Sequence, residues 1–438
     1  MDMLTKQDNE LMCRTGAGTA MGGAMRRFWL PVIQSSDLPP PNGDPKTIEL
    51  LGQRFVVWRD QGGRPGLYDE GCLHRGASMQ LARADGDGLR CIYHGWKFAV
   101  DGTVLETPNV PDPKFKERLK GRTYPVREAG GLMWAYLGPR DKEPPFPHRA
   151  FMDQPDSHRI NVCAIVNCNF VQVIEGLVDS SHLSVLHSSA LAQTNHSNLD
   201  YAGKITHMQF DAAPTIEADE TDFGFHYVAI RQAGENRIAR VTSFIAPSFI
   251  ANANGDVWLA AVPINDERCY FFHVWWDAEK PIGEEPLRSA QLTFVGLDEP
   301  TLRKYGMTLD TCDSPAAMSF VNGYRQDRQS QRNGHFTGFD GITQEDAACS
   351  ISSGPIRDRS QEMLSSADLA ISRLHRTLLA CARAARSAGH SGAARGIGPR
   401  DRHLRRGWSG RGLAATGSAP PDRFAVRRAH AAQLITRF

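Results

Sequence analysis

The stretch CLHRGASMQLARADGDGLRCIYHGWKF, residues 72–98, holds the pattern that decides the fold of the N-terminal part of this chain. It begins with Cys72-Leu-His74, continues for sixteen residues, and then gives Cys91-Ile-Tyr-His94. Two thiolates and two imidazoles in this order suit either a tetrahedral zinc ion or a [2Fe–2S] cluster of the Rieske type.

The way the four side chains are divided between two loops favours the cluster. One iron of a Rieske centre takes two thiolates and the other takes two imidazoles, so each ligand loop must offer one Cys and one His. Both loops of this chain do so, whereas zinc sites of this composition more often pair Cys with Cys and His with His. We therefore predict a [2Fe–2S] cluster with four ligands, namely Cys72, His74, Cys91 and His94.

Short apolar stretches around this motif have the length and spacing of β-strands. They lie at residues 47–51, 54–59, 96–100 and 132–137. Glycine-containing turns between strands of this length are typical of an all-β module. We predict such a domain over residues 28–142, followed by a proline-rich linker that starts at Glu143, and we expect residues 1–27 to form a polar helix and a glycine-rich turn.

A second set of metal-binding side chains lies at Glu175-Gly-Leu-Val-Asp179-Ser-Ser-His182-Leu-Ser-Val-Leu-His187. Non-haem Fe(II) oxygenases use two His and one carboxylate on one face of the metal. His182 and His187 would supply the pair, on a helix near residues 170–188. A spacing of five residues separates them by about 140° on an ideal helix, so the helix must end or distort between them, which Ser184 and Val185 would permit.

Asp179 is the next candidate, because a residue three positions before His182 shares its helical face. There it could accept a hydrogen bond from a ligand imidazole. The third iron ligand must come from a distant part of the chain. Asp346 in Gly341-Ile-Thr-Gln-Glu345-Asp346 is the candidate, and its neighbour Glu345 competes with it. Residue chemistry alone leaves the choice between the two open.

The region around this second motif, residues 143–385, mixes helices with alternating strands. Strand patterns occur at residues 226–231, 257–262 and 270–276, and a helical pattern runs from about 361 to 385. We predict an α+β domain with an antiparallel sheet.

The last segment, residues 386–438, has eleven Arg but neither Lys nor Glu, and is rich in Gly and Ala. We expect it to be disordered or the product of a shifted reading frame, and assign it no function.

Composition and charge set further bounds. A chain of 438 residues with 41% hydrophobic residues fits two domains, and a net charge of +1 favours neither nucleic acid nor membranes as partners. The N-terminus lacks the pattern of a secretory signal, and no apolar run reaches about 18 residues. We therefore expect a cytoplasmic protein in which the seven Cys other than Cys72 and Cys91 are buried or incidental thiols.

Together these motifs resemble the α-subunits of Rieske non-haem iron ring-hydroxylating oxygenases, in particular the branch of phthalate 4,5-dioxygenase. The resemblance covers about residues 3–385, and its order of blocks is specific for the family but much less so for a substrate. The blocks include Arg26-Arg-Phe-Trp-Leu-Pro31, Tyr93-His-Gly-Trp-Lys-Phe98, Tyr124-Pro-Val-Arg-Glu-Ala-Gly-Gly131, Glu175-Gly-Leu-Val-Asp-Ser-Ser-His182 and Gly354-Pro-Ile-Arg-Asp-Arg359.

The resemblance implies a Rieske β-sandwich followed by a helix-grip-like iron domain. It assigns the cluster to the two Cys-and-His loops, and Fe(II) to His182, His187 and Asp346 rather than Glu345. Asp179 would bridge a cluster His of one subunit to an iron His of the next, in a homo-oligomer that is a trimer or a multiple of one. A reductase with flavin and a [2Fe–2S] cluster would pass on electrons from NADH or NADPH, and the substrates would be an aromatic molecule and dioxygen.

Two departures and several alternatives accompany this interpretation. Leu73 stands where the family usually has Pro, and the segment from residue 386 has no counterpart in the family pattern.

The same metal ligands would serve hydroxylation of the ring or O-demethylation and other monooxygenation of an aryl ether. A non-catalytic Rieske electron carrier and a nucleic-acid binder with a basic tail are the other hypotheses. An acidic substrate would need a cation, for which Arg231 and Arg240 are candidates, although surface positions are the simpler interpretation of both.

Overall fold

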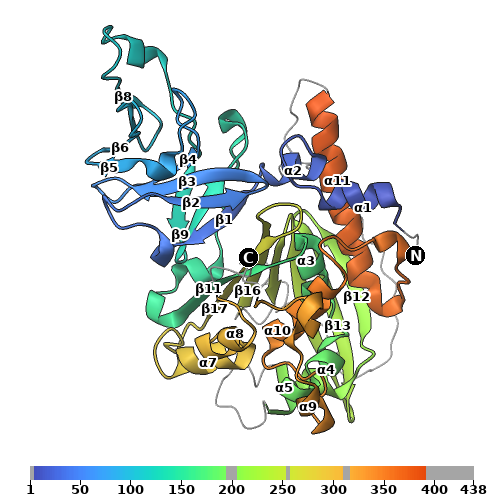
Figure 1. Cartoon of the computed structure of the whole chain (residues 1–438). Coiled ribbons are helices and arrows are strands. Elements are labelled where there is room, and N and C mark those ends of the chain that lie inside the picture. The colour runs from blue at the N-terminus through green and yellow to red at the C-terminus, as the bar shows by residue number, and fades with distance from the viewer. Residues whose placement is uncertain (1–3, 194–204, 253–256, 309–315, 391–438) are drawn as a thin grey trace, which may run out of the picture.

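The computed structural model describes residues 4–193, 205–252, 257–308 and 316–390 (Figure 1). Its strands form small sheets in the N-terminal part and one large antiparallel sheet in the C-terminal part. Figure 1 places the N-terminal strands at the upper end of the molecule and the helices α4 and α9 at the lower end, with α10 just above them. The predicted α+β class is confirmed.

The N-terminal domain consists of three sheets, with the strand orders β1-β10-β9, β2-β3-β4 and β5-β6-β7-β8. Its strands are β1 (Trp29–Gln34), β2 (Lys46–Leu50), β3 (Gln53–Arg59), β4 (Pro65–Asp69), β5 (Arg83–Asp85), β6 (Gly88–Arg90), β7 (Lys97–Ala99), β8 (Val104–Glu106), β9 (Val126–Ala129) and β10 (Leu132–Tyr136). Strand β10 is buried along its whole length, and its Trp134 ring lies 5.5 Å from that of Trp258 in the large sheet. Aromatic packing therefore joins the two domains.

The large sheet has the strand order β11-β17-β16-β15-β14-β13-β12, and every neighbouring pair is antiparallel. Its strands are β11 (Arg159–Val166), β12 (Thr215–Thr221), β13 (Gly224–Ala233), β14 (Asn236–Ile245), β15 (Phe249–Asn252), β16 (Val257–Pro263) and β17 (Cys269–Trp276). In β13 every second residue is buried from Phe225 to Arg231, so one face of this strand packs inward. That inward face carries the buried side chain of Arg231.

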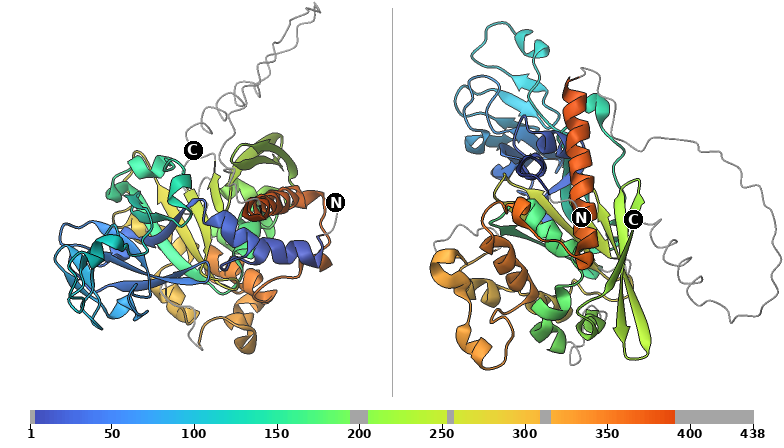
Figure 2. Two further views of the ribbon diagram at one scale, coloured as in Figure 1. Left: turned by 90° about the horizontal axis from the view of Figure 1, so that it is seen from above. Right: turned by 90° about the vertical axis from the view of Figure 1, so that its right-hand side faces the viewer.

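Helices cover one face of the large sheet and flank its end. They are α3 (Phe170–Val178), α4 (Leu183–Leu186), α5 (Ser188–Gln193), α7 (Leu287–Val295), α8 (Glu299–Lys304), α9 (Arg328–Arg332), α10 (Ile342–Ser352) and α11 (Leu369–His390). The two N-terminal helices, α1 (Lys6–Cys13) and α2 (Ala20–Met25), pack against α11, so the two ends of the described chain lie together (Figure 2).

A buried ionic cluster fastens this junction. The Arg359 guanidinium donates to both carboxylate oxygens of Glu175 on α3, at 2.5 and 2.8 Å, and to the Asn9 side chain of α1. His375 of α11 lies 2.5 Å from the same carboxylate. Because removal of one partner would leave an uncompensated buried charge, the cluster holds α3 in one position.

The structure corrects three expected element boundaries. The predicted glycine-rich turn includes helix α2, whose Gly22 packs so closely that a Cβ there would lie 2.2 Å from the Thr15 carbonyl oxygen. The C-terminal helix begins at Leu369 rather than near 361, because a turn capped by Ser365 and Asp368 precedes it. It continues past residue 386 to His390, and the rest of the unassigned tail lies outside the described residues.

The third correction concerns the helix predicted at residues 170–188. It is interrupted between Val178 and Leu183, because the Asp179 carboxylate accepts hydrogen bonds from the backbone N–H and the hydroxyl of Ser181, both at 2.7 Å. Such a local side-chain bond competes with the helix for the backbone. The interruption therefore falls at residues 179–182 and not at Ser184 or Val185, which lie inside α4.

In the part of the chain that the structure describes, every helix is too short or too polar to cross a lipid bilayer.

Candidate metal centres

Two matching turns present the predicted cluster ligands. The Gly76 N–H donates to the Cys72 carbonyl at 2.8 Å, and the Gly95 N–H donates to the Cys91 carbonyl at 3.0 Å. Both glycines have positive φ values, +70° and +74°, which side chains with a Cβ rarely adopt. Each loop thus folds back on its own cysteine and carries one thiol and one imidazole to the same place.

The four side chains converge under an aromatic cover. The His74 and His94 rings lie 4.5 Å apart, while both Cys side chains are buried. Trp96 stacks on His74 at 4.6 Å and within 6° of parallel, and its indole N–H donates to Asn109 at 2.7 Å. This packing fixes the His74 ring in the way that neighbours of a metal ligand do.

The donor set fits a [2Fe–2S] cluster. The Nδ1 atom of His94 is buried and has no hydrogen-bond partner among the described residues, which leaves it available to a metal. Burial raises the pKa of the Cys72 thiol to about 11, although hydrogen bonds from the amides of His74 and Arg75 act in the opposite direction. Amides that favour the charged sulfur would also favour a cluster-bound thiolate.

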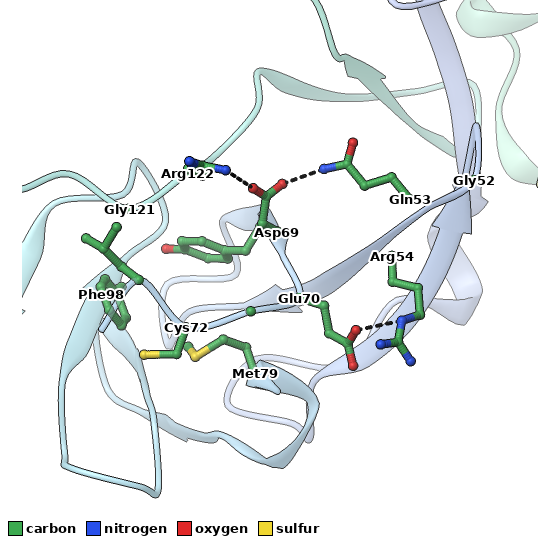
Figure 3. Close-up of a pocket in the computed structure, with 13 residues that line it drawn as sticks. Gly52, Gln53, Arg54, Asp69, Glu70, Cys72, Met79, Phe98, Gly121 and Arg122 are labelled. Atoms are coloured by element: carbon green, nitrogen blue, oxygen red, sulfur yellow. Dashed lines mark hydrogen bonds and ion pairs between the residues drawn. The ribbon is translucent and has the colours of Figure 1, made fainter. Parts of the chain in front are cut away.

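A hollow of about 540 Å³ adjoins the Cys72 loop on the N-terminal domain (Figure 3). Its charged side chains form ion pairs, Asp69 with Arg122 and Glu70 with Arg54, and Asp69 also accepts a hydrogen bond from the Gln53 amide (Figure 3). The hollow offers no unpaired charge for a polar substrate, so we do not assign substrate binding to it.

The second centre lies where α3, α4 and α10 meet. His182 precedes the single-turn helix α4 and His187 follows it, and their Nε2 atoms lie 3.2 Å apart. The Asp346 carboxylate, on α10, lies 3.5 Å from the His182 Nε2 atom and 3.2 Å from that of His187. The interrupted helix thus brings together two imidazoles that the five-residue spacing alone would separate.

Glu345 has a different place from its neighbour. Its Oε2 atom lies 2.6 Å from the Nδ1 atom of His187, and its Oε1 atom accepts a hydrogen bond from the Thr337 hydroxyl at 2.5 Å. Both carboxylate oxygens are engaged on the far side of the His187 ring. This arrangement orients the imidazole so that its Nε2 atom faces Asp346. From the sequence, Glu345 was only an alternative to Asp346 as the third iron ligand, and no spacing pattern indicated a role for Thr337.

Asp179 reaches the centre from the interrupted segment. Its Oδ2 atom lies 3.5 Å from the Nδ1 atom of His182. It sits at the end of α3 in an extended conformation, so the two residues do not share a helical face as predicted. Burial opposes ionisation of Asp179, but His182 and the hydrogen bonds from Ser181 outweigh it and lower the pKa to about 2. The carboxylate is therefore charged at neutral pH.

His273 on β17 was missed by the sequence analysis. Its ring lies between the rings of Phe271 and Trp275, at 3.9 and 5.1 Å, and its Nε2 atom is buried without a partner among the described residues. Burial lowers its pKa to about 3, against the opposing charge of nearby Asp346. A neutral imidazole with an unengaged nitrogen thus lies beside the second centre.

A hollow of about 410 Å³ opens on the outer side of this centre. Asp179, His182 and Asp346 line it together with apolar side chains and with further polar ones, among them Glu175 and Arg357. Two of the apolar side chains are well exposed, Val185 at 46% and Phe336 at 54%. The charged Asp179 therefore faces a hollow whose rim includes exposed apolar side chains.

The geometry fits a mononuclear metal. Donor atoms of His182, His187 and Asp346 all lie within 4.8 Å of one another. Two imidazoles and one carboxylate are the donor set that non-haem Fe(II) uses when open coordination positions are needed. Burial alone would lower the pKa of His187, but Asp346 and Glu345 raise it to about 10 in the metal-free protein.

From this pKa we expect iron binding to strengthen as the pH rises. At pH 6–8 the metal-free His187 is protonated, so a metal that binds there must displace a proton. The affinity should increase about tenfold per pH unit up to the pKa. Calorimetric titration of the apo-protein with Fe(II) under anaerobic conditions, in buffers of different ionisation enthalpy, would measure the released protons. An affinity that is constant from pH 6 to pH 8 would contradict this assignment.

Comparisons with known proteins match both halves of the chain. The model described as a Rieske [2Fe–2S] domain matches residues 28–124, and the model described as LigXa C-terminal domain like matches residues 135–406. The second match runs past residue 386, so the similarity extends further toward the C-terminus than the sequence analysis placed it.

Curated relatives match across most of the chain. The phthalate 4,5-dioxygenase oxygenase subunit of Pseudomonas putida is 36% identical and covers 86% of each protein. The 3-chlorobenzoate-3,4-dioxygenase oxygenase subunit of Comamonas testosteroni is 33% identical over 87% of this chain and 89% of the relative. Among solved structures, dicamba monooxygenase bound to dicamba shares the fold, with a TM-score of 0.53 over 83% of this chain and 98% of that one, at 15% identity.

Proposed function

This chain belongs to the Rieske non-haem iron oxygenases as an oxygenase subunit, and from that premise we propose that it uses dioxygen to hydroxylate an aromatic substrate. The observation that carries the proposal is that one chain assembles two donor sets, thiols with imidazoles in the first domain and imidazoles with a carboxylate in the second. In this family a [2Fe–2S] cluster supplies electrons and a mononuclear Fe(II) activates dioxygen.

The residues take distinct parts in this scheme. The cluster ligands would be Cys72, His74, Cys91 and His94. Fe(II) would be held by His182, His187 and Asp346, a donor set that non-haem Fe(II) uses when it must also bind dioxygen. Glu345 would keep the His187 ring in place. The buried side chains of His187 and Glu345 would exclude water from one side of the centre, which limits unproductive reduction of dioxygen.

We propose a head-to-tail homo-oligomer, a trimer or a multiple of one. The cluster loops and the α4–α10 region lie at opposite ends of one chain (Figure 1), so electrons need a second copy to pass between them. Exposed apolar side chains occur at both ends: Ile92 and Tyr93 beside the cluster are 61% and 54% exposed, and Val185 and Phe336 line the rim of the outer hollow. Exposed apolar groups of this kind favour burial between copies.

Asp179 would be the link between copies. It is ionised, is held by Ser181 and His182, and lines the outer hollow that the cluster loops of a neighbour would fill. A reductase with a flavin and its own [2Fe–2S] cluster would supply the electrons from NADH or NADPH.

The substrate class follows from Arg240. The β13–β14 register pairs Arg240 with Ala229 and Thr242 with Tyr227, so Arg240 lies on the inward face of the sheet rather than at an outward position. Among the described residues no carboxylate forms an ion pair with it. A half-buried guanidinium without an anion suits a substrate carboxylate. We therefore propose an aromatic carboxylic acid as substrate.

Replacement of Arg240 by Met should raise the KM for an aromatic acid about 10- to 100-fold with a smaller change in kcat, because a charge-assisted hydrogen bond contributes about 1.5–3 kcal/mol. The KM for a neutral aryl ether should change little. Steady-state oxygen uptake with both substrates measures the split. Equal losses for the acid and the ether would remove Arg240 from substrate recognition.

Oxygen uptake with product analysis tests the function itself. The full-length protein, reconstituted with iron and a competent reductase, is given a panel of aromatic acids and aryl ethers. Substrate-dependent oxygen consumption with a hydroxylated product is expected for an aromatic acid. Formaldehyde from an aryl ether would instead favour O-demethylation. A protein with a Rieske spectrum but no mononuclear iron and no uptake would be an electron carrier.

A further inference from the structure

Arg231 on β13 is a fully buried arginine, with 0% of its surface exposed. Its Nη1 and Nη2 atoms each lie 3.1 Å from the Ser180 hydroxyl oxygen, and Nη2 also donates to the Ser180 carbonyl. Its Nε atom donates to the Asp211 carbonyl at 3.2 Å. The guanidinium is thus directed at one residue of another element and at one backbone carbonyl.

This buried charge has no carboxylate bonded to it among the described residues. Burial lowers the pKa of Arg231, and Arg240 on the neighbouring strand acts in the same direction, while Asp211 and Asp179 act at longer range to raise it. A buried cation that is compensated mainly by neutral groups is costly to keep. A buried arginine of this kind indicates that the position of the groups it binds, here Ser180 and the Asp211 carbonyl, is important.

Ser180 lies at the centre of that geometry. It is 2% exposed and sits in the four-residue interruption between α3 and α4, directly after Asp179 and two positions before His182. The Arg231 guanidinium approaches Ser180 from the sheet, whereas Asp179 and His182 line the outer hollow. Ser180 is consequently held on the side of the sheet, while Asp179 and His182 present their side chains on the opposite side, toward the hollow.

We propose that Arg231 is a positioning residue, which fixes the 179–182 turn through Ser180 and thereby sets the distance from the Asp179 carboxylate to His182. The inference rests on the proposed function, because that function assigns electron transfer between the two centres to the turn that carries Asp179. Arg231 itself donates to neither of the predicted iron-binding imidazoles nor to Asp346. It also follows that Arg231 is not the substrate cation considered above, since its donors are already engaged.

The test uses the full-length oligomeric enzyme with both metals loaded. The cluster is reduced anaerobically and mixed with dioxygen and the aromatic acid on which the wild-type enzyme is active, and cluster re-oxidation is followed by its visible absorbance. Arg231→Met should slow this single turnover about tenfold or more, at the lower end of what loss of an orienting partner costs. Arg231→Lys should recover part of the rate, because an ammonium can still donate to Ser180. Ser180→Ala should give a smaller loss, because the carbonyl remains.

Two further measurements separate positioning from general stability. The EPR spectrum of the Fe(II)–nitric oxide adduct should change in Arg231→Met but not in Arg237→Met, a control on an exposed arginine of the adjacent strand β14. The double variant Arg231→Met/Ser180→Ala should be no slower than Arg231→Met alone, because both changes break one interaction.

Additive losses, or an unchanged rate and EPR spectrum in Arg231→Met, would overturn the inference. Should Arg231→Met not fold, Arg231→Lys and Ser180→Ala decide it by the same readouts. Wild-type protein whose reduced cluster is not re-oxidised by dioxygen and substrate would instead count against the proposed function.

Discussion

Replacing Asp179 with Asn should leave both metal centres filled and still slow turnover by about 100-fold, the upper end of what loss of a partner beside a metal ligand costs. Asn has nearly the same shape but no charge. The wild-type carboxylate, with its pKa lowered to about 2, is ionised throughout the working range of pH, so the effect should not depend on pH between 5 and 8. Iron analysis, the Rieske visible spectrum and steady-state oxygen uptake measure the three quantities.

The most informative readout for Asp179→Asn is the single-turnover oxidation of the reduced cluster. It should lose as much rate as steady-state turnover does, because the change affects transfer between copies and not substrate binding. Asp219→Asn is the matched control, since its carboxylate is 87% exposed on β12. If Asp179→Asn kept its metals and turned over at the wild-type rate, Asp179 would not be the bridge.

The sequence predicted most where the ligands lie close together along the chain. The two cluster loops need only local turns to present a Cys and a His each, and Gly76 and Gly95 provide them. The sequence also placed the strands at residues 226–231, 257–262 and 270–276 correctly. The first alternates between buried and half-buried positions, and the other two are nearly continuous apolar runs. These features depend on the nearest neighbours of each residue.

Two features escaped prediction, one because of a local side-chain bond and the other because of a contact between distant segments. The helix interruption at residues 179–182 contains neither Gly nor Pro, and arises because the Asp179 side chain takes a backbone donor from the helix. Arg231 is buried only because Ser180, 51 positions away, comes to lie against its strand. An arginine in an alternating strand has no local sign of such a partner, and composition alone favours a surface position.

The adjacent pair Glu345 and Asp346 gives the second large prediction. These adjacent residues of α10 place their carboxylates on different sides of the His187 ring. Glu345 bonds to Nδ1 with one oxygen and accepts a hydrogen bond from Thr337 with the other, while Asp346 lies beside Nε2. Because a metal bound at Nε2 is within reach of Asp346 alone, the two acids should fail in different ways.

We expect Asp346→Ala to bind no iron at stoichiometric concentrations and to lose all measurable turnover, with the Rieske spectrum intact. Glu345→Gln should still bind iron, with an affinity about 10- to 100-fold weaker, because the amide oxygen can still accept from His187 but no longer carries charge. Anaerobic Fe(II) titration of both variants, with the cluster spectrum as an internal control for folding, makes the comparison.

The opposite ranking, in which Glu345→Gln abolishes binding and Asp346→Ala retains it, would reassign the ligand. The metal-free proteins provide an independent check through protonation. Asp346 precedes Glu345 among the carboxylates that raise the pKa of His187, so Asp346→Ala should lower that pKa more than Glu345→Gln does. Titration of the His187 ring by NMR in the two apo-variants would then rank the carboxylates without any metal present, and agreement of both rankings would tie the ligand to Asp346 through its position at Nε2.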